Sequence, residues 1–379
     1  MSKVIFGDVV KRANTKEDRH NTDKLYYVGG EHIESNEVLI ENRGIIEGST
    51  IGPMFYFGFK AGDILFVSRN PHLRKSGIVT FDGICSEKTF VLETKDESVL
   101  LQRYLAFVMQ SDHFWSYMEA HKSGSVNFFI NWSTLAKYEF ELPDIEKQKS
   151  VSDMLWAINN TKLSYRKLIV ATRSLAKSKF HETFNHLPRV KLGEYIDQIR
   201  GVSYKPNDLS PELDSEHVTL FRANNISQSK IVFDDVQFVS KSKVSSAQII
   251  KKGDILMCAS SGSIEHVGKV ALCDFIGEYT FGAFCKLLRP NSVLHSEYIA
   301  AYLDSDEYRR VISDLAQGTN INNLRNEHID NLEIPMPTEA SQKEYIAFWN
   351  DCNKSEFELK QAIDNLDALT RSILAENFN

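Results

Sequence analysis

The sequence predicts an α+β protein in which two β-rich lobes are joined by two long helices, with an internal pseudo-two-fold repeat. The first observation is the repeat itself: between Val99 and Phe184, 17 of 86 positions are identical to the residue 194 positions later, without a gap. The second is a pair of long stretches without Gly or Pro, each of which follows a proline. The third is a series of short apolar runs separated by turn residues, which is typical of strands. A repeat of this length indicates a duplicated structural unit.

The first lobe spans residues 1–142 and is expected to be mainly β. Strands are predicted where apolar runs are bounded by turn residues, at Lys24–Gly29, Phe55–Phe59, Asp63–Ser68 and Lys88–Glu93. A helical segment, Val99–Ala120, follows these strands, and a loop is predicted at Gly124.

Residues 143–189 contain the first predicted spacer helix, which is expected to run from Pro143 to Phe184. A proline just inside a helix start loses no intrahelical hydrogen bond. Apolar or small residues at steps of three and four predict an a/d heptad seam against a second helix. The residues expected to pack between the helices are Val151, Met154, Leu155, Ile158, Tyr165, Leu168 and Leu175, with Tyr345, Phe348, Cys352, Leu359, Leu366 and Leu369 on the second helix.

The second lobe, residues 190–337, and the second spacer helix, residues 338–379, repeat this order. Strands are predicted at Ile231–Phe238, Asp254–Ala259, Gly268–Cys273 and Phe284–Leu288, and a helical segment at Val293–Leu315 with a loop at Gly318. The sequence Gly-Asp-Ile-Leu occurs in both lobes, 191 residues apart, so small insertions lie within the β-rich parts. Residues 143–189 carry a net charge of +5 and residues 338–379 a net charge of −4, which favours pairing of the two helices within one molecule.

Composition places the chain among ordinary globular proteins, with 42% hydrophobic and 25% charged residues. The five cysteines show no spacing typical of zinc sites, and their odd number is typical of reduced thiols in a cytoplasm. No apolar run is long enough to span a bilayer, and the N-terminus lacks the pattern of a secretory signal. We therefore expect a cytoplasmic protein that does not bind membranes. The net charge of −7 cautions against tight DNA binding by this chain alone, although an acidic protein can present a basic groove.

Sequence patterns of enzyme sites are absent or weak. The phosphate-binding pattern GxxxxGK[ST] does not occur, and Asn70–Leu73 only partly matches the Asn/Asp-Pro-Pro-aromatic tetrapeptide of methyltransferases. A nuclease-like set can be drawn from Asp82 and Glu93-Thr94-Lys95, but common residue types in such loose order often arise by chance. His181 and His186 lack metal-ligand spacing. We predict no catalytic residue, no metal site and no cofactor bound by this chain.

Polar and basic loops that follow predicted strands are better candidates, because their side chains suit nucleic acid. Arg can bond guanine edges, Asn can pair with adenine, and Lys or Ser can hold phosphate. The candidates in the first lobe are Arg69, Asn70, His72, Arg74, Lys75, Ser125 and Asn127. In the second lobe they are Arg222, Asn224, Asn225, Lys251, Lys252, Ser261, Ser263, Lys269, Thr319, Asn320 and Arg325. For any one loop, the simplest interpretation is a solvated surface segment. The presence of corresponding loops in both lobes favours a role in binding.

The chain resembles the specificity (S) subunits of type I restriction–modification systems over essentially its whole length. One feature that carries the resemblance is Phe59–Leu65 running on to Phe81–Ser86. Another is the Gly–Ser or Gly–Thr loop, followed by Leu142-Pro143…Gln148 and by Pro335-Met336-Pro337…Gln342 at the starts of the long helices. The third is the duplicated order of a lobe followed by a helix.

The resemblance implies that each lobe is a target-recognition domain that reads half of a split, asymmetric DNA sequence. The two helices would pair as an antiparallel coiled coil and fix the gap between the half-sites. The implied partners are double-stranded DNA, two modification subunits that supply S-adenosylmethionine and adenine-N6 methylation, and, in the full complex, two restriction subunits that use ATP and Mg. The chain itself would be the non-catalytic subunit.

Two other classes of function stay open at this point. One is a coiled-coil scaffold without DNA readout, and the other is an autonomous nuclease or methyltransferase. A neighbouring methyltransferase gene with Asn-Pro-Pro-Phe-type chemistry would separate DNA recognition from the scaffold. Methylation by the purified chain without a partner would favour the autonomous enzyme.

Overall fold

The computed structural model describes the backbone of residues 2–291, 293–319 and 323–378. The chain divides into two compact units. Unit 1 comprises residues 1–167 and 359–379, and unit 2 comprises residues 168–358. Each long helix is therefore shared between the units, whereas the sequence divides the chain at the helix ends. The four predicted domain boundaries remain a proposal.

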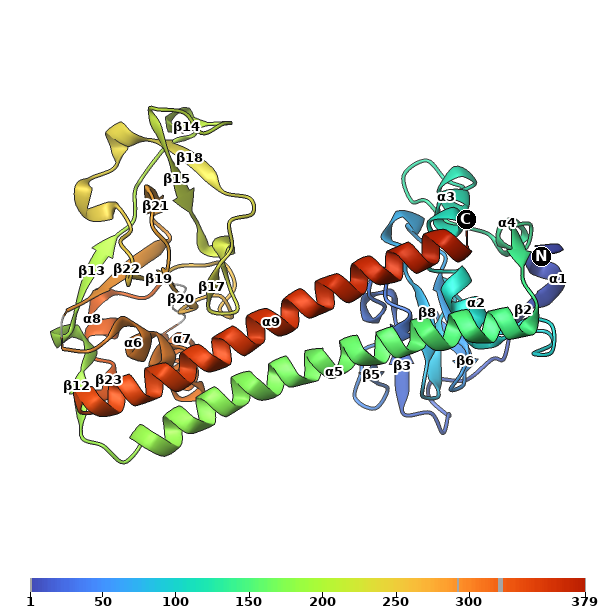
Figure 1. Ribbon diagram of the computed structural model, residues 1–379, viewed down its shortest axis with the longest axis horizontal. Helices are drawn as coiled ribbons and strands as arrows, with labels where there is room; N and C mark the ends of the chain where they lie inside the picture. Colours follow the sequence, from blue (N-terminus) through green and yellow to red (C-terminus); the bar gives the residue numbers. More distant parts are fainter. Residues whose placement is uncertain (1, 292, 320–322, 379) are drawn as a thin grey trace. The chain divides into compact units, whose positions relative to one another are not determined.

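Unit 1 contains a five-stranded sheet, a four-stranded sheet and a two-stranded sheet (Figure 1). The first has the order β2-β10-β7-β8-β4, the second β5-β3-β9-β6, and the third pairs β1 with β11. The strands are β1 (Ser2–Ile5), β2 (Val10–Ala13), β3 (Tyr26–Val28), β4 (Leu39–Ile40), β5 (Gly44–Ile45), β6 (Phe55–Phe59), β7 (Ile64–Val67), β8 (Ser76–Val79), β9 (Gly83–Ser86), β10 (Thr89–Thr94) and β11 (Glu139–Leu142). The short helices are α1 (Phe6–Val9), α2 (Gln102–Val108), α3 (Asp112–Ala120) and α4 (Trp132–Leu135).

Unit 2 has two four-stranded sheets, with the orders β13-β22-β19-β20 and β14-β18-β15-β21. Two-stranded sheets pair β12 with β23 and β16 with β17. The strands are β12 (Arg189–Lys191), β13 (Ile196–Arg200), β14 (Leu209–Ser210), β15 (His217–Phe221), β16 (Ile226–Ser227), β17 (Lys230–Ile231), β18 (Gln237–Ser240), β19 (Ile255–Cys258), β20 (Val270–Leu272), β21 (Tyr279–Phe281), β22 (Cys285–Pro290) and β23 (Glu333–Pro335). The short helices are α6 (Ser296–Leu303), α7 (Asp306–Thr319) and α8 (Asn326–Asp330).

Strand β7 shows why an uninterrupted apolar run forms a strand here. Successive side chains of a strand point to opposite faces of its sheet. Ile64 and Phe66 lie in the core under helices α2 and α3, whereas Leu65 and Val67 lie in the core between the two larger sheets. Both faces are therefore buried, and the run has no polar alternation. In β19 of unit 2 the same alternation divides Ile255 and Met257 from Leu256 and Cys258.

The long helices are α5 (Ile145–Phe184) and α9 (Glu339–Asn377), which occupy the stretches predicted from the prolines (Figure 1). In unit 1, Leu155 of α5 shares a core with Leu374 of α9, and Lys162 pairs with Asp367. Residue numbers rise along one helix as they fall along the other, so the helices are antiparallel within this unit. In unit 2, Arg173 pairs with Glu356, and the Phe180 ring lies 5.3 Å from that of Tyr345, which gives the same direction.

A buried glutamine fixes the start of each long helix in the same way. In unit 1, Gln148 accepts a hydrogen bond from Leu101 N and donates to Val99 O and Pro143 O, at 2.9–3.0 Å. In unit 2, Gln342 accepts from His295 N at 2.9 Å and donates to Val293 O at 3.3 Å. Gln342, His295 and Val293 lie 194 positions after Gln148, Leu101 and Val99. The bond from Gln148 to Pro143 O is an additional contact in unit 1. The repeat seen in the sequence therefore recurs as a repeated set of contacts.

Each predicted lobe helix is two helices in the structure. Val99–Ala120 is broken between α2 and α3, and Val293–Leu315 between α6 and α7. Serine explains both breaks, because Ser111 Oγ accepts from Phe114 N and Ser305 Oγ accepts from Tyr308 N, each at 3.2 Å. A side chain that caps a new helix in this way ends the helix before it.

Two further predictions about the second lobe were wrong. Ile231–Phe238 is not one strand, because the chain turns at Asp235, whose φ of 50° is left-handed and incompatible with a strand. Helix α7 continues through Gly318, where the sequence predicts a loop.

The seam between the long helices differs from the predicted one on α5. At every second predicted seam position, the buried residue is the next one along the chain. Val151, Leu155 and Ile158 are buried, as expected. The next buried seam residues of α5 are Lys162, Ile169 and Ala176, rather than their neighbours. The predicted residues that the structure exposes are Met154, Leu168 and Leu175 on α5, with exposed fractions of 50–55%, and Leu369 on α9 at 47%. The a/d assignment was wrong at these positions because the seam passes through Lys162, which an ion pair with Asp367 allows to be buried and which an apolar pattern does not indicate.

Candidate nucleic-acid interface

Two candidate loops of unit 1, separated by 46 residues of sequence, lie side by side. Ile130 N donates to Ser68 O at 2.8 Å, and Asn70 N donates to Phe128 O at 2.9 Å. Arg69 forms an isolated antiparallel bridge with Phe129, and its guanidinium lies 5.3 Å from the centre of that ring. Residues 69–75 and 122–129 therefore form one surface, which we call loop pair 1.

The first loop of this pair is shaped by two left-handed residues. Asn70 and Arg74 have φ values of 51° and 49°, on either side of the 3-10 turn Pro71–Leu73. Asn adopts this conformation more readily than most residues. Arg74 forms an ion pair of 2.5 Å with Asp112, and Lys75 Nζ donates to Gly30 O at 2.6 Å. These two cations are therefore already engaged within the protein.

The remaining candidates of loop pair 1 face solvent. Asn70, His72, Ser125 and Asn127 are exposed, and Arg69 is half-buried. Arg69 Nη1 lies 3.5 Å from Asn127 O, so its long side chain leans across to the second loop. Cations and amide groups of the two loops thus share one face of unit 1.

The sequence prediction missed two side chains of loop pair 1. Lys122 Nζ lies 4.3 Å from the centre of the Phe128 ring and pairs with Glu119 at 2.7 Å. Val126, at the tip of the second loop, is 82% exposed. An apolar residue at a loop tip between Ser125 and Asn127 was the available signal.

Unit 2 brings the corresponding loops together. Leu324 N donates to Ala259 O at 2.8 Å, and Ser260 forms an isolated antiparallel bridge with Asn323. These residues lie 191 and 194 positions after those of the equivalent contacts in unit 1, which matches the two offsets of the sequence repeat. We call residues 260–269 and 323–325 loop pair 2.

The candidate residues of loop pair 2 differ in chemistry from those of loop pair 1. Lys269 and Ser263 are exposed, and Ser261 Oγ accepts from Ser263 N at 3.2 Å. Arg325 is exposed and pairs with Glu327 at 3.3 Å. Asn320 and the side chain of Thr319 lie outside the described residues.

Phe284 is the residue of unit 2 that the sequence prediction missed. The residue is 71% exposed, while its carbonyl oxygen accepts from Ala259 N at 2.9 Å and Ser260 N at 3.0 Å. The backbone contact places it at the base of loop pair 2. The equivalent carbonyl in unit 1 belongs to Lys88, which accepts from Ser68 N at 2.8 Å. The same backbone position therefore presents a cation in one unit and an exposed aromatic ring in the other.

The structure contradicts the prediction that Asn225 contacts DNA. Asn225 is fully buried, its Oδ1 accepts from Arg222 N, and its Nδ2 donates to Val232 O and Asp234 O, at 2.8–2.9 Å. The amide therefore closes a loop inside unit 2 and offers no group to a base. Its neighbours Arg222 and Asn224 both bind the Asp235 side chain.

Lys251 and Lys252 do not share a surface with loop pair 2. They precede strand β19, whereas Ser260 follows it, so the two groups lie at opposite ends of that strand. Lys252 pairs with Asp274 at 2.8 Å. The predicted residues of the second lobe thus fall into separate groups, of which loop pair 2 is one.

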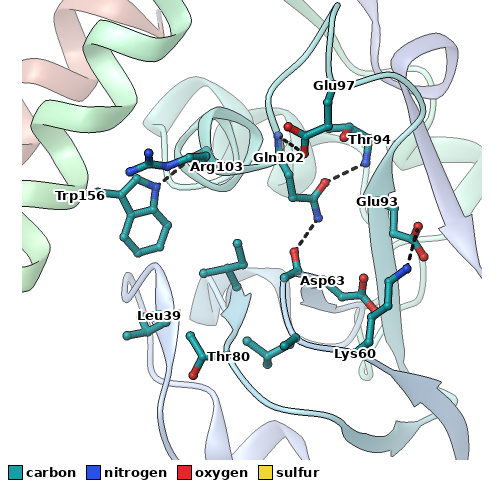
Figure 2. Close-up of a pocket in the computed structure, with 14 residues that line it drawn as sticks. Leu39, Lys60, Asp63, Thr80, Glu93, Thr94, Glu97, Gln102, Arg103 and Trp156 are labelled. Carbon is teal, nitrogen blue, oxygen red and sulfur yellow. Dashed lines mark hydrogen bonds and ion pairs between the residues drawn. The ribbon is translucent and has the colours of Figure 1, made fainter.

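A groove of unit 1 is lined by residues of strands β8 and β10 and of helix α2, among others (Figure 2). It has a volume of about 740 Å³ and is lined by Asp63, Gln102 and Trp156 among others. Gln102 donates to Gly62 O and accepts from Thr94 N, and Trp156 Nε1 donates to Arg103 O. Burial raises the pKa of Asp63 to about 6.

Of the nuclease-like residue set, Glu93 and Thr94 line this groove, whereas Asp82 and Lys95 are engaged elsewhere. Asp82 accepts from Ala61 N and pairs with Lys24, while Lys95 Nζ donates to Gly7 O. Glu93 pairs with Lys11 at 3.1 Å. Within the described residues, no group of three or more His, Cys, Asp or Glu side chains is placed to hold a metal ion. No helix in the described part of the chain is both long and apolar enough to cross a membrane.

The fold defines a class of protein with two β-rich units, each built against the same pair of antiparallel helices. Solved structures of type I restriction–modification systems have this fold. An S subunit from M. genitalium matches with a TM-score of 0.59 and 12% identity, and covers 100% of this chain and 96% of its own. A chain from a structural study of the assembly and conformational transition of a type I system matches with a TM-score of 0.59 and 18% identity, covering 99% of this chain and 97% of its own.

Sequence comparison finds similar proteins of the same kind. Residues 214–366 match the type I restriction modification DNA specificity domain. The specificity subunit of the type I restriction enzyme EcoKI from Escherichia coli (strain K12) is 42% identical over 145 residues, which are 38% of this chain and 31% of that protein. The MjaVIII specificity subunit from Methanocaldococcus jannaschii is 21% identical over 334 residues, or 82% of this chain and 74% of that protein. Residues 214–366 are thus similar to type I DNA specificity domains, and the predicted resemblance to specificity subunits is confirmed.

The two matches above 40% identity cover only part of the proteins concerned. The chain spans about a third of the length of the E. coli relative and of the StySPI specificity subunit from Salmonella potsdam, to which it is 41% identical over 145 residues.

Proposed function

We propose that this chain is the DNA-sequence specificity subunit of a type I restriction–modification complex. The observation that carries the proposal is the presence of the same two adjoining loops in both units, with different side chains on them. Equivalent surfaces of different chemistry suit a target made of two unlike half-sites. A scaffold without DNA readout gives no reason for exposed loop residues to diverge in this way.

Each loop pair offers groups that suit one part of a DNA contact. In loop pair 1, Arg69 can fork to a guanine edge and Asn127 can pair with adenine. Lys122 can hold a phosphate and so fix the register on the duplex. In loop pair 2, Lys269 and Arg325 can bind phosphates. Phe284 offers a flat apolar face to a base or a thymine methyl group.

The acidic net charge suits a division of labour with partner subunits. Phosphate neutralisation by Lys and Arg supplies much of the affinity of DNA-binding proteins. This chain has a net charge of −7, so the partners are proposed to supply most of the positive charge that neutralises the phosphates. The proposed partners are two modification subunits, which carry S-adenosylmethionine and methylate adenine, and two restriction subunits, which use ATP and Mg. This chain binds none of these cofactors and has no catalytic role in the proposal.

Exchange of one lobe tests the proposal directly. Residues 1–142 are replaced by the corresponding lobe of another specificity subunit, and the methylated motif is read in cells that hold the modification subunits. The expected result is a new sequence in one half-site and an unchanged second half-site. Exchange of residues 190–337 is the matched control and should alter the other half-site. A motif that changes in both halves, or in neither, contradicts modular reading.

A further inference from the structure

The long helices are joined by one buried ion pair in each unit. In unit 1, Lys162 pairs with Asp367. In unit 2, Arg173 donates to both carboxylate oxygens of Glu356, at 2.8 and 2.7 Å. Lys162 is 6% exposed and Glu356 is 4% exposed, so each pair contains a charge removed from water. Such a charge is strongly destabilising when its partner is lost.

The two ion pairs occupy the same two positions of the repeat. Lys162 and Glu356 are 194 residues apart, and so are Arg173 and Asp367. Lys162 and Glu356 thus occupy one position of the repeat, and Arg173 and Asp367 occupy another. In both units, the residue at one of these positions on one helix pairs with the residue at the other position on the second helix. The signs are segregated, because α5 supplies the cation of both pairs and α9 supplies the anion of both.

The apolar part of the seam does not share this asymmetry. Leu155 packs with Leu374 and Phe378 in unit 1, and Phe180 and Phe184 pack with Tyr345 in unit 2. These positions are apolar in both copies of the repeat. An α5 set against a second α5, or an α9 against a second α9, would therefore still bury an apolar seam.

The charged positions distinguish these arrangements. In the same antiparallel register, two α5 helices would set Lys162 against Arg173, and two α9 helices would set Glu356 against Asp367. Either arrangement places like charges together at positions that are largely buried, and like-charge contacts of this kind exclude wrong partners.

We propose that the two ion pairs restrict the helix surface to one kind of partner, a helix that carries the opposite charge pattern. An α5 pairs with an α9, either of its own chain or of a second copy, and like helices are excluded. This device gives each helix pair two unlike lobes and excludes helix pairs that carry two copies of the same lobe. The inference concerns pairing alone and stands apart from the proposed DNA readout.

Charge reversal in the full-length chain tests this inference. One variant combines Lys162→Glu and Arg173→Glu, which makes the α5 positions anionic. The other combines Glu356→Lys and Asp367→Lys, which makes the α9 positions cationic. Two lobe residues also face these charges, since Glu37 lies 3.9 Å from Lys162 and Lys230 lies 3.4 Å from Glu356. All chains therefore also carry Glu37→Gln and Lys230→Gln, and the chain with these two changes alone is the reference.

Each variant alone is expected to have a Tm several degrees below the reference. After the two variants are unfolded and refolded together, native mass spectrometry should show a species of one copy of each, at twice the 43.2 kDa mass of the chain. A chain that carries all four reversals should refold as a monomer with most of the reference Tm restored. This chain preserves the test even where a single variant fails to fold.

Matched reversals at exposed positions of the same helices control for net charge. These are Lys167→Glu with Lys179→Glu on α5, and Asp351→Lys with Asp364→Lys on α9. They should leave the Tm within a degree or two of the reference and produce no paired species. The inference is overturned if the seam variants are as stable as these controls, if each variant dimerises with itself as readily as with the other, or if the fourfold variant is not restored.

Discussion

The buried glutamines at the starts of the long helices give a prediction whose magnitude follows from counted hydrogen bonds. Gln148 makes three bonds to backbone groups, at 2.9–3.0 Å, and is 1% exposed. Gln342 makes two, of which the bond to Val293 O is long at 3.3 Å. A buried bond of this kind contributes about 1 kcal/mol, and more when a partner is left unsatisfied. Gln148→Ala should therefore destabilise unit 1 by about 3 kcal/mol, and Gln342→Ala should destabilise unit 2 by about 2 kcal/mol.

Amide hydrogen exchange measured by mass spectrometry is the suitable assay, because it reports each unit separately. The Leu101 amide loses its acceptor in Gln148→Ala, and peptides that contain it should exchange roughly a hundredfold faster, since 1.4 kcal/mol corresponds to a factor of ten. Peptides that contain His295 should respond to Gln342→Ala by a smaller factor. Gln361→Ala, at an exposed position of α9, is the control. The reasoning fails if Gln148→Ala accelerates exchange no more than this control, or if Gln342→Ala has the larger effect.

Three further predictions concern the loops, the helices and a buried carboxyl. Alanine at both Arg69 and Lys122 should weaken DNA binding by the assembled complex, measured by fluorescence anisotropy. The slope of log affinity against log salt should become shallower by about 1 for each phosphate that is no longer neutralised. An unchanged slope would mean that neither cation touches phosphate. Insertion of one heptad after Lys167 and another after Glu358 adds about 10 Å to each helix, and the gap between methylated half-sites should widen by about three base pairs; a constant gap would show that the helices do not set it. Burial raises the pKa of Asp63 to about 6, so the folded state holds a proton that the unfolded chain lacks between about pH 4 and pH 6, and stability falls as pH rises through this window. Asp63→Asn, which can still accept from Lys60 N, should raise the thermal stability of unit 1 more at pH 7 than at pH 5; an equal gain at both values would contradict this assignment.

The helical framework was predictable because its signals are local and occur twice. The prolines, the long Gly-free stretches and the matched glutamines specify α5 and α9 from the sequence. The serine caps were visible as Ser111 and Ser305 of the repeat, but an N-cap inside a continuous apolar pattern is easily taken for a helical residue.

The errors arose where long-range packing decides the outcome. The seam of α5 passes through Lys162, because an ion pair with α9 makes a buried lysine acceptable, and no heptad pattern of apolar residues indicates this. Asn225 resembles a base-reading amide in sequence but closes a loop on backbone atoms. Phe284 was taken for an ordinary strand residue, although it precedes the strand and its ring faces solvent.

The adjacency of the candidate loops was also beyond the sequence. Residues 69–75 and 122–129 are separated by strands β8, β9 and β10, helices α2 and α3, and turns. The contacts of Ser68, Arg69 and Asn70 show that the two loops form one surface. The side chains of this surface were predicted from residue type, and their contacts with bases remain a prediction.

Methylome sequencing of cells with and without this gene tests the central claim most directly. The account predicts that deletion removes adenine methylation from one asymmetric motif, made of two short sequences separated by a fixed gap, and that re-expression of the chain restores it. Methylation that is the same at every motif in both strains would contradict the proposal that this chain specifies a DNA target.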